Sequence, residues 1–377
     1  MEYQKNSKYF AQVAGSLEPI AALELQELGA ADIQTTYRGI SFSADEATLY
    51  RILYQTRICS RILAPLISFQ CHSEKYLHKS AMQIDWTQFL DLKEKFAINS
   101  NVSNSKISNS MYAGQVLKDA ICDVFREKFD ARPDFDAKEA DVRFNLHISE
   151  NWANISIDLG GEPLHKRGYR KETVKAPLQE TLAAAIIRLT LWNGEQMLYD
   201  PFCGSGTILT EAIMHYCRIP AGFLRKEWGI FRMPGFNKEL WDKLKAAADN
   251  NIRDLPEGLL AGSDIAGVCV HASIGNCNTF SQGRNVVIKR LDYREIDELE
   301  NMVIATNPPF GKRLYEGEAE KILKELGDFL KQKCQGSRAY VLVGSKELAF
   351  ALRLRYKMNK LLKNGDIESR LLRIDLY

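Results

Sequence analysis

Short apolar runs alternate with helical patterns through the second half of the chain, from about residue 177 onwards. Each run has the length of a buried strand and ends at a polar residue or a glycine. This alternation predicts an α/β domain with a doubly wound sheet and a ligand site at the carboxyl ends of its strands. Residues 218–256 resemble an insertion between a helix and the next strand. The predicted strands are 195–200, 258–264, 285–292, 301–307 and 338–344.

The first 160 residues follow a different pattern. Helical spacing over 45–63 and 111–129 is mixed with strands and with two hairpins, one around Gly39 and one over 140–161. The polar–apolar alternation of the second hairpin suits a sheet with one face in water. This order predicts α+β structure without a nucleotide-binding turn, so we do not expect catalysis here. The break at Gly160–Pro163 is the predicted boundary.

The segment "DPFCGSGT" (Asp200–Thr207) joins the first strand of the second half to a helix. Gly204 and Gly206 let the backbone turn tightly and approach a ligand, while the N–H groups of the helix point towards it. The segment lacks the full Gly-x-Gly-x-x-Gly pattern, and the acid expected about twenty residues later is missing. A cofactor with a ribose but no pyrophosphate, such as S-adenosylmethionine, therefore fits better than NAD. The alternative is a plain β–α turn whose glycines serve only packing.

Two acids follow the next predicted strands. Asp264 closes the strand 258–264 and could accept hydrogen bonds from both hydroxyls of a ribose, because a carboxylate has two acceptor oxygens. Asp292 follows the next strand and could accept one from the amino group of adenine. Each could instead be an ordinary acid at a strand end or a helix cap.

A second loop motif, "TNPPFGK" (Thr306–Lys312), follows another predicted strand. Pro308 and Pro309 remove two backbone donors and stiffen the loop, so the Asn307 side chain and the Pro308 carbonyl point in fixed directions as acceptors. Acceptors suit an exocyclic amine of a nucleobase, whose lone pair must be tilted out of the ring before it can attack a methyl group. Phe310 is expected to stack on the base, a contact worth about 1–3 kcal/mol.

Composition narrows the setting of this chemistry. Hydrophobic residues make up 45% and charged residues 26% of the 377 residues, as in a globular protein. No apolar run has the length of a membrane span and the N-terminus lacks the apolar segment of a signal peptide, so we expect a cytoplasmic protein. No Cys-x-x-Cys pair occurs, so we expect reduced, mostly buried thiols and no metal site. The eight cysteines are Cys59, Cys71, Cys122, Cys203, Cys217, Cys269, Cys277 and Cys334.

Charge is informative only locally, because the net charge is +2. The run His165–Lys175 has five Lys and Arg residues against one acid, and the run Arg353–Arg373 has seven against two. Each run fits a solvated charged face as well as it fits a phosphate-binding patch.

Taken together, the motifs resemble the class I S-adenosylmethionine-dependent methyltransferases that modify exocyclic amines. "HKRGYR", "APLQETLAAAII", "DPFCGSGTILTEA", "TNPPFGKRL" and "KNGDIESRLLRIDLY" are similar to the bacterial THUMP-domain RNA methyltransferases, and within them to the RlmL group. The resemblance implies a ferredoxin-like segment (1–60), a THUMP RNA-binding domain (61–164) and a Rossmann-like catalytic domain (165–377). The catalytic domain is expected to have a mostly parallel seven-stranded sheet with an antiparallel hairpin at its C-terminal end.

The resemblance also implies roles for individual residues. Asp264 is expected to hold the ribose of S-adenosylmethionine and Asp292 its adenine, with Glu180 as a further residue on the cofactor side. The residues expected to hold the target guanine are Asn307, Pro308, Pro309 and Phe310. The residues expected to line the methionine side are Asp200, Cys203, Gly204, Ser205, Gly206 and Thr207.

The activity implied by the resemblance is methylation of N2 of a guanine in large-subunit (23S) ribosomal RNA, with the base taken out of any helix into the pocket. Three alternatives stay open. The same chemistry could act on tRNA, because the catalytic loop does not distinguish the two RNAs. Methylation of adenine N6 in DNA shares the loop, although the RNA-type N-terminal half counts against it. The chain could also be a non-catalytic RNA-binding or ribosome-assembly factor. Its oligomeric state and its target nucleotide do not follow from the sequence.

Overall fold

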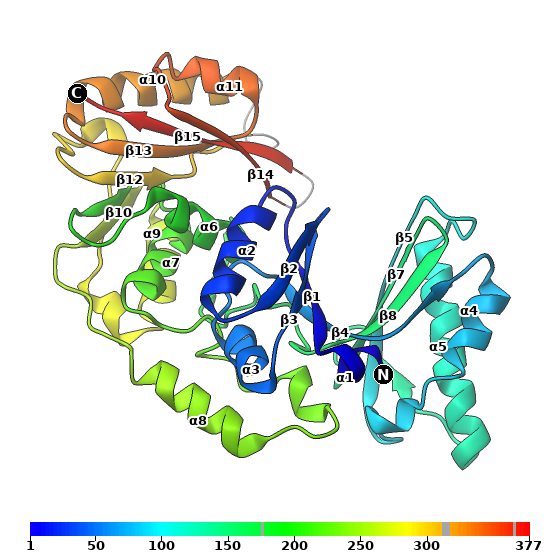
Figure 1. Cartoon of the computed structure of the whole chain (residues 1–377). Helices are drawn as coiled ribbons and strands as arrows, with labels where there is room; N and C mark the ends of the chain where they lie inside the picture. The colour runs from blue at the N-terminus through cyan, green and yellow to red at the C-terminus, as the bar shows by residue number, and fades with distance from the viewer. Residues whose placement is uncertain (175–176, 311–316, 365–366) are drawn as a thin grey trace.

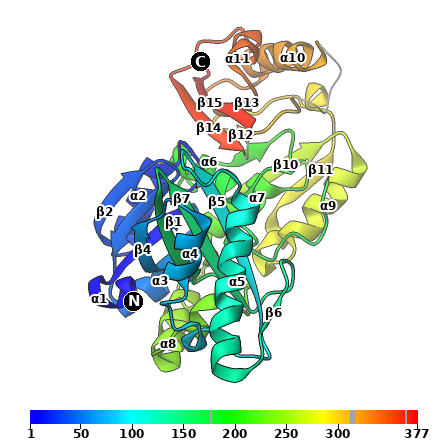
Figure 2. The same ribbon diagram turned by 90° about the vertical axis from the view of Figure 1, so that its right-hand side faces the viewer.

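The computed structural model describes residues 1–174, 177–310, 317–364 and 367–377 (Figure 1). These residues form two sheets. Sheet A belongs to the N-terminal half, and sheet B begins at Leu198. The sheets are separate bodies of structure, and helices and loops join them (Figures 1 and 2).

Sheet A mixes parallel and antiparallel strands. Its strand order is β2-β3-β1-β4-β8-β7-β5-β6, in which β5 runs parallel to β6 and β7 and the other neighbours are antiparallel. The elements, with η for a short 3-10 helix, are α1 (Glu2–Asn6), β1 (Lys8–Gln12), α2 (Glu18–Glu27), β2 (Ala31–Thr36), β3 (Gly39–Ser43), α3 (Glu46–Gln55), β4 (Arg61–Gln70), α4 (Glu74–Ala81), η1 (Trp86–Gln88), β5 (Lys95–Ser103), α5 (Ser110–Phe129), β6 (Asp134–Phe135), β7 (Val142–Ser149) and β8 (Trp152–Asp158).

Strand β4 joins the two predicted N-terminal segments into one sheet. One of its edges pairs with β1 and the other with β8, so the backbone hydrogen bonds cross the predicted boundary at residue 60 without a break. The segment boundaries at residues 60 and 164 therefore stay predictions, while the α+β character of this half is confirmed.

The helix predicted over 45–63 is shorter in the structure, because α3 ends at Gln55. A buried carboxylate explains the ending. Glu24 of α2 accepts hydrogen bonds from the Thr56 hydroxyl (2.7 Å) and from the backbone N–H of Arg57 (2.9 Å) and of Ile58 (3.1 Å). These bonds draw the chain off the helical path and lead it into β4, which begins at Arg61.

Sheet B has the strand order β11-β10-β9-β12-β13-β15-β14, parallel except for β15, which runs antiparallel to both of its neighbours. This is the predicted fold class, with its C-terminal hairpin. The elements of this half are α6 (Glu180–Thr190), β9 (Leu198–Asp200), α7 (Thr207–Tyr216), η2 (Gly229–Arg232), α8 (Lys238–Asp249), β10 (Leu260–Asp264), α9 (Gly267–Cys277), η3 (Ser281–Asn285), β11 (Val287–Arg290), η4 (Tyr293–Glu295), β12 (Val303–Thr306), α10 (Glu318–Lys333), β13 (Arg338–Val343), α11 (Lys346–Ala351), β14 (Met358–Asn364) and β15 (Ile367–Asp375).

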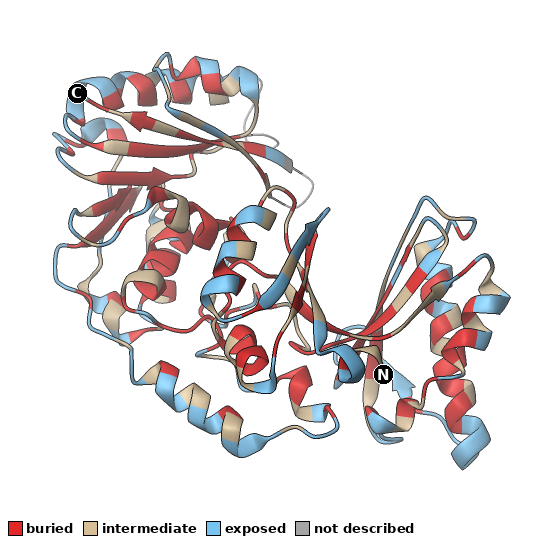
Figure 3. Cartoon of the chain, in the orientation of Figure 1, coloured by how far each residue is buried: buried red, intermediate tan, exposed pale blue. Residues whose placement is uncertain are grey.

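The central strands of sheet B are buried on both faces (Figure 3). Successive residues of β13 show this, because Tyr340 and Leu342 belong to the cluster under α6 and α7, whereas Val341 and Val343 belong to the cluster under α10 and α11. A strand with helices on both sides is apolar at every position, which is why these strands were readable as continuous apolar runs.

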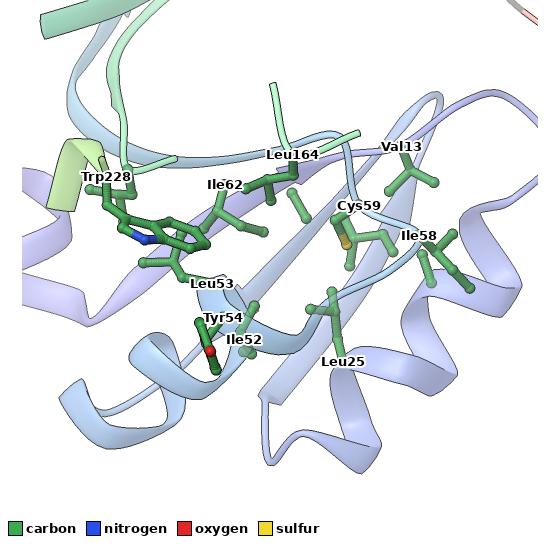
Figure 4. Close-up of a cluster of buried hydrophobic side chains, with 14 of the residues drawn as sticks. Val13, Leu25, Ile52, Leu53, Tyr54, Ile58, Cys59, Ile62, Leu164 and Trp228 are labelled. Carbon is green, nitrogen blue, oxygen red and sulfur yellow. The ribbon is translucent and has the colours of Figure 1, made fainter. Parts of the chain in front are cut away.

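The predicted insertion, residues 218–256, packs against the N-terminal half. Trp241 of α8 makes edge-to-face contacts with Tyr50 and Tyr54 of α3, at centroid distances of 5.6 and 6.1 Å. Trp228 meets Trp241 at 5.3 Å and lies beside core residues of the first segment (Figure 4). Aromatic packing of this kind fixes the two halves relative to each other. Among the described residues no helix is long and apolar enough to cross a membrane.

Candidate active site

The loop from Asp200 to Thr207 leads from the end of β9 into α7, as predicted. Gly206 has a φ of +76°, and a Cβ there would lie 2.3 Å from Oγ of Ser273, so only glycine fits. Gly204 has a φ of +53°, and a Cβ there would meet nothing within 4 Å. The backbone at Gly204 therefore borders open space that a ligand could occupy, which fits a cofactor cradle.

Asp264 holds this loop directly. One carboxylate oxygen accepts the N–H of Gly204 (3.0 Å) and the other accepts the N–H of Ala266 (2.9 Å). Each carboxylate oxygen has a second acceptor position. The side chain is thus oriented by the protein while keeping capacity for two hydroxyl groups, which is what binding a ribose requires.

Asp200 connects the two loop motifs. It is 1% exposed, and its Oδ1 accepts hydrogen bonds from the Thr306 hydroxyl (2.7 Å) and from the N–H of Phe202 (3.1 Å). Burial raises the pKa of Asp200 to about 7, a rise to which the nearby Asp264 carboxylate adds. Since Thr306 is the first residue of "TNPPFGK", this bond brings the ends of β9 and β12 together.

The acceptor loop begins at Asn307, just after β12. Its Oδ1 is buried and has no hydrogen-bond partner in the part of the chain that the structure describes. A buried amide oxygen without a partner costs about 1–3 kcal/mol, so an incoming N–H group would be bound favourably there. Phe310 packs on Gly344 at the end of β13, where a Cβ would lie 2.6 Å from Cδ2 of the ring. Gly311 and Lys312 lie outside the described residues.

Asp292 lies beyond β11, next to Asp264 in the sheet. The N–H of Leu291 donates to the Asp264 carbonyl (3.1 Å), and the ring of Tyr293 lies 4.8 Å from that of Phe202 in the glycine loop. The Asp292 carboxylate accepts from the backbone and side chain of Arg294, and this ion pair lowers its pKa. Asp292 therefore lies at the edge of sheet B where the parallel strands end, as predicted. Part of the acceptor capacity of its carboxylate is used by Arg294.

Arg170 is a site residue that the sequence-based prediction missed. Its guanidinium donates to Glu180 (2.9 Å), to Oγ of Ser205, to Oγ1 of Thr207 and to the Leu178 carbonyl (each 3.1 Å). Glu180, expected on the cofactor side, forms an ion pair with Arg170, and its role towards the cofactor stays a prediction. Arg170 thus fixes the helical end of the glycine loop. The sequence signals were its place in the run His165–Lys175 and in the segment "HKRGYR".

Asn276 of α9 is a second residue that the prediction missed. Its Nδ2 donates to the Ser205 carbonyl (2.9 Å) and to the Glu172 carbonyl (3.1 Å), and its Oδ1 accepts the N–H of Lys171 (2.9 Å). Asn276 therefore ties the glycine loop to the segment that carries Arg170.

Two further members of this basic run point into the protein. Arg167 forms an ion pair with Glu211 of α7 (3.5 Å), and the Tyr169 hydroxyl donates to the same carboxylate (3.1 Å). Arg167 and Glu211 are each 1% exposed. The run was expected to be a solvated face or a phosphate-binding patch. Its arginines, Arg167 and Arg170, fit neither alternative, because each pairs with a buried carboxylate. Lys175 lies outside the described residues.

The cysteines offer no chemistry at this edge. Burial raises the pKa of the Cys203 thiol well above its ordinary value, so the group stays protonated at neutral pH and is a poor nucleophile. Across residues 1–174, 177–310, 317–364 and 367–377, no three His, Cys, Asp or Glu side chains gather as a metal site would need.

Comparison with known families covers most of the chain. Residues 167–373 match the RMKL-like methyltransferase domain, residues 71–158 the THUMP domain, and residues 8–63 the RlmL ferredoxin-like domain. These matches confirm the resemblance drawn from the sequence motifs.

Individual relatives agree. The chain is 34% identical over 371 residues to the Synechocystis protein slr0064, provisionally named an RNA methyltransferase, and the match covers 98% of this chain and 97% of the relative. It is also 34% identical over 384 residues to the ribosomal RNA large subunit methyltransferase K/L of Syntrophotalea carbinolica, covering 98% of this chain and 53% of that protein. The chain thus spans about half the length of the K/L protein. A crystal structure of SMU.472, provisionally named a methyltransferase and complexed with SAH, shares the fold with a TM-score of 0.86 at 23% identity, covering 99% of this chain and 98% of that one.

Proposed function

The chain belongs to the RMKL-like methyltransferase family, and we propose that it transfers a methyl group from S-adenosylmethionine to N2 of a guanine in large-subunit (23S) ribosomal RNA. The observation that carries this proposal is the buried Oδ1 of Asn307, which has no hydrogen-bond partner among the described residues and lies beside the glycine loop through the bond between Thr306 and Asp200. An orphaned acceptor next to a cofactor cradle suits a substrate that presents N–H groups.

S-adenosylmethionine supplies an electrophilic methyl group when bound. The open backbone at Gly204 and the oriented carboxylate of Asp264 would hold its methionine and ribose portions, and Asp292 would face the adenine. Asp200 would lie on the methionine side, where an ionised carboxylate favours the ammonium group. The solved structure SMU.472 with SAH supports this assignment through its shared fold.

The acceptor loop would act on the amine by position and electrostatics. Asn307 Oδ1 and the Pro308 carbonyl would each accept one N–H of the exocyclic amine, which turns its lone pair out of the ring plane and towards the methyl group. Because the acceptors are fixed before the base arrives, little reorganisation is needed in the transition state. Pro309 would stiffen the loop, and Phe310, supported by Gly344, would cover a face of the base.

The RNA substrate is inferred from the THUMP match and from the K/L relative. Guanine N2 as the target atom, the ribosomal over the transfer RNA, and a cytoplasmic location are parts of the proposal. Guanine N2 in tRNA is the second candidate, because the described acceptor loop has the same geometry for either RNA.

The test is transfer of a labelled methyl group to unmodified ribosomal RNA, bulk tRNA and duplex DNA, followed by nucleoside analysis. N2-methylguanosine in ribosomal RNA is the expected product. A product in tRNA alone, or N6-methyladenine, would overturn the proposal. Absence of S-adenosylmethionine binding in calorimetry would leave only a non-catalytic RNA-binding role.

Asn307→Ala is expected to lower methyl transfer by at least about 100-fold, since an acceptor aimed at the transition state contributes on the order of 2.7–4 kcal/mol. Binding of S-adenosylmethionine, measured by calorimetry, should stay within about threefold. Asn278→Ala, at the exposed end of α9, is the matched control and should leave both quantities unchanged. Full activity of Asn307→Ala would refute the acceptor role.

A further inference from the structure

The second basic run, Arg353–Arg373, extends towards the N-terminal half through the β14–β15 hairpin (Figure 1). Near the end of β14, Lys363 places its Nζ 5.9 Å from the centre of the Tyr37 ring, in the turn between β2 and β3. The stem of Lys363 also lies against Gly15, where a Cβ would be 3.2 Å from its Cδ. Two distant parts of the chain thus build one small surface.

This surface lies at the same edge of sheet B as the candidate active site. Thr306, the last residue of β12, pairs with Val341 of β13, and Val343 at the end of β13 pairs with Arg370 of β15. Lys363 pairs with Glu368, so it stands beyond the ends of these parallel strands. The hairpin therefore projects past the edge at which Asn307 follows β12.

Tyr37 is held outwards by a well-bonded turn. Its side chain is 77% exposed. The neighbouring Arg38 has its carbonyl bonded to the N–H of Val13 (3.1 Å) and its N–H bonded to Glu18 (2.9 Å), while the Thr36 hydroxyl donates to the Gly39 carbonyl (3.3 Å). The turn can present an aromatic ring to a ligand without first becoming ordered, which lowers the entropic cost of binding.

Two basic side chains, of Lys363 and Arg38, lie beside this ring, while the Glu18 carboxylate is bonded to the backbone N–H of Arg38. Among the described residues no carboxylate lies within ion-pair distance of Lys363 or of the Arg38 side chain. Elsewhere in the same run Lys357 and Arg373 share the carboxylate of Asp375. Positive charge beside an exposed ring is the combination that single-stranded nucleic acid recognises, through stacking and phosphate contacts together.

We propose that Tyr37, Arg38 and Lys363, the Tyr37 surface, bind an unpaired nucleotide of the RNA next to the target base. The base stacks on Tyr37, and its flanking phosphates lie against Lys363 and Arg38. The inference rests on the proposed function, since it takes RNA as the substrate, and it adds a second contact at a different place on the chain. Its consequence is that the N-terminal segment takes part in positioning the RNA at the edge of sheet B.

A matched control exists at the other end of the hairpin. Tyr377 is 87% exposed, and Lys357 lies over its ring at 5.8 Å with a hydrogen bond to its hydroxyl of 3.1 Å. The chemistry is the same, but Lys357 is paired with Asp375 and lies at the opposite edge of the sheet. Tyr377→Ala is therefore expected to leave RNA binding unchanged.

The experiment measures binding of the full chain to a fluorescent unstructured RNA and to a blunt RNA duplex, together with KM and kcat for methyl transfer. Tyr37→Ala should weaken binding to the unstructured RNA by about 5- to 100-fold, the range set by base–aromatic stacking, and should raise KM with little change in kcat. Tyr37→Phe and Tyr37→Trp should stay within about threefold of the wild type. Binding to the duplex should not change, because its bases are already stacked. Lys363→Ala should reduce the slope of log affinity against log salt by about 0.7.

The outcomes separate this inference from the proposed function. Equal binding by Tyr37→Ala and the wild type, or equal losses in Tyr37→Ala and Tyr377→Ala, would overturn the inference. So would a loss confined to thermal stability, which would make the Tyr37 surface only a latch between two parts of the chain. A wild-type chain that binds RNA but methylates none would refute the proposed function while leaving the Tyr37 comparison valid. A wild-type chain that binds no RNA would overturn the inference as well.

Discussion

The two basic runs have similar compositions, but the arginines of the first face the interior, whereas the second lies largely at the surface. In the first, His165–Lys175, Arg167 and Arg170 point inwards and bind buried partners. In the second, Arg353–Arg373, most of the basic side chains lie on the surface of a hairpin, and several pair with nearby acids. One run holds the glycine loop in place, and the other presents charge to the solvent.

The difference comes from partners that are distant in sequence. The first run passes close to Glu211 of α7 and Glu180 of α6. Both of these carboxylates are buried. A buried carboxylate requires a cation, so it draws the arginines inwards. The second run pairs with Glu368, which is exposed, and with Asp375, whose side chain is 16% exposed, so the paired groups remain in contact with solvent and the pairs have less energetic weight. A local charge count cannot distinguish these situations.

The largest effect is expected at Glu211. Glu211→Ala leaves the buried Arg167 without its carboxylate, and breaking such a pair costs about 3–5 kcal/mol. The urea midpoint of the unfolding transition should fall clearly. Glu239→Ala, on the exposed face of α8, should change the free energy of unfolding by less than about 0.5 kcal/mol. Equal midpoints for the two variants would show that the first run is a solvated face after all.

A somewhat smaller effect is expected at Arg170. Arg170→Ala removes the bonds to Ser205 and Thr207 and leaves Glu180 unpaired. We expect the affinity for S-adenosylmethionine in calorimetry to fall by about 100-fold, since a hydrogen bond to a charged group contributes about 1.5–3 kcal/mol. Arg170→Lys should recover part of the loss, because one ammonium cannot replace the planar fork. Unchanged affinity in Arg170→Ala would separate the first run from the cofactor loop.

The next effect concerns pH. The pKa of Asp200 is raised to about 7 by burial, so the carboxyl group is mostly neutral at pH 6 and mostly ionised at pH 8. An ionised Asp200 favours the ammonium of the cofactor, and the affinity for S-adenosylmethionine should therefore rise by up to about tenfold from pH 6 to pH 8. Asp200→Asn should make the affinity independent of pH in this range. A wild-type affinity that falls with rising pH would contradict the role proposed for Asp200.

The smallest effect is expected at Lys357, in the second run. Lys357 pairs with Asp375, and its own side chain is 58% exposed. Lys357→Ala should change RNA affinity by less than about twofold and the free energy of unfolding by less than about 1 kcal/mol. A loss of affinity as large as that of Lys363→Ala would mean that the run acts through its total charge and not through particular positions.

Much of the fold and part of the candidate site were predictable from local pattern. The central strands of sheet B are buried on both faces, so they are continuous apolar runs. The glycines at 204 and 206 and the prolines at 308 and 309 mark loops by their backbone chemistry. Asp264 was recognisable because it ends a strand, and the structure places it on the N–H of Gly204.

The rest depends on contacts between distant residues. The early end of α3 follows from Glu24, a residue on another helix that accepts three hydrogen bonds after the helix stops. Arg170 and Asn276 contact the glycine loop from other segments, and neither contact can be read from the stretch of sequence that carries the residue. The pairing of Glu180 with Arg170 was likewise not visible in the sequence. Pairing across space, and not local propensity, decides each of these cases.

Strand β4 has a consequence for the order in which the chain acquires structure during synthesis. Its first edge can pair with β1 as soon as residues 61–70 have left the ribosome, but the partner of its second edge, Trp152–Asp158, is translated much later. Until then a ten-residue strand presents unpaired N–H and C=O groups, the kind of edge that recruits other chains. Ribosome-bound chains should therefore be prone to aggregation until Trp152–Asp158 have also left the ribosome, after which β4 has its second pairing partner.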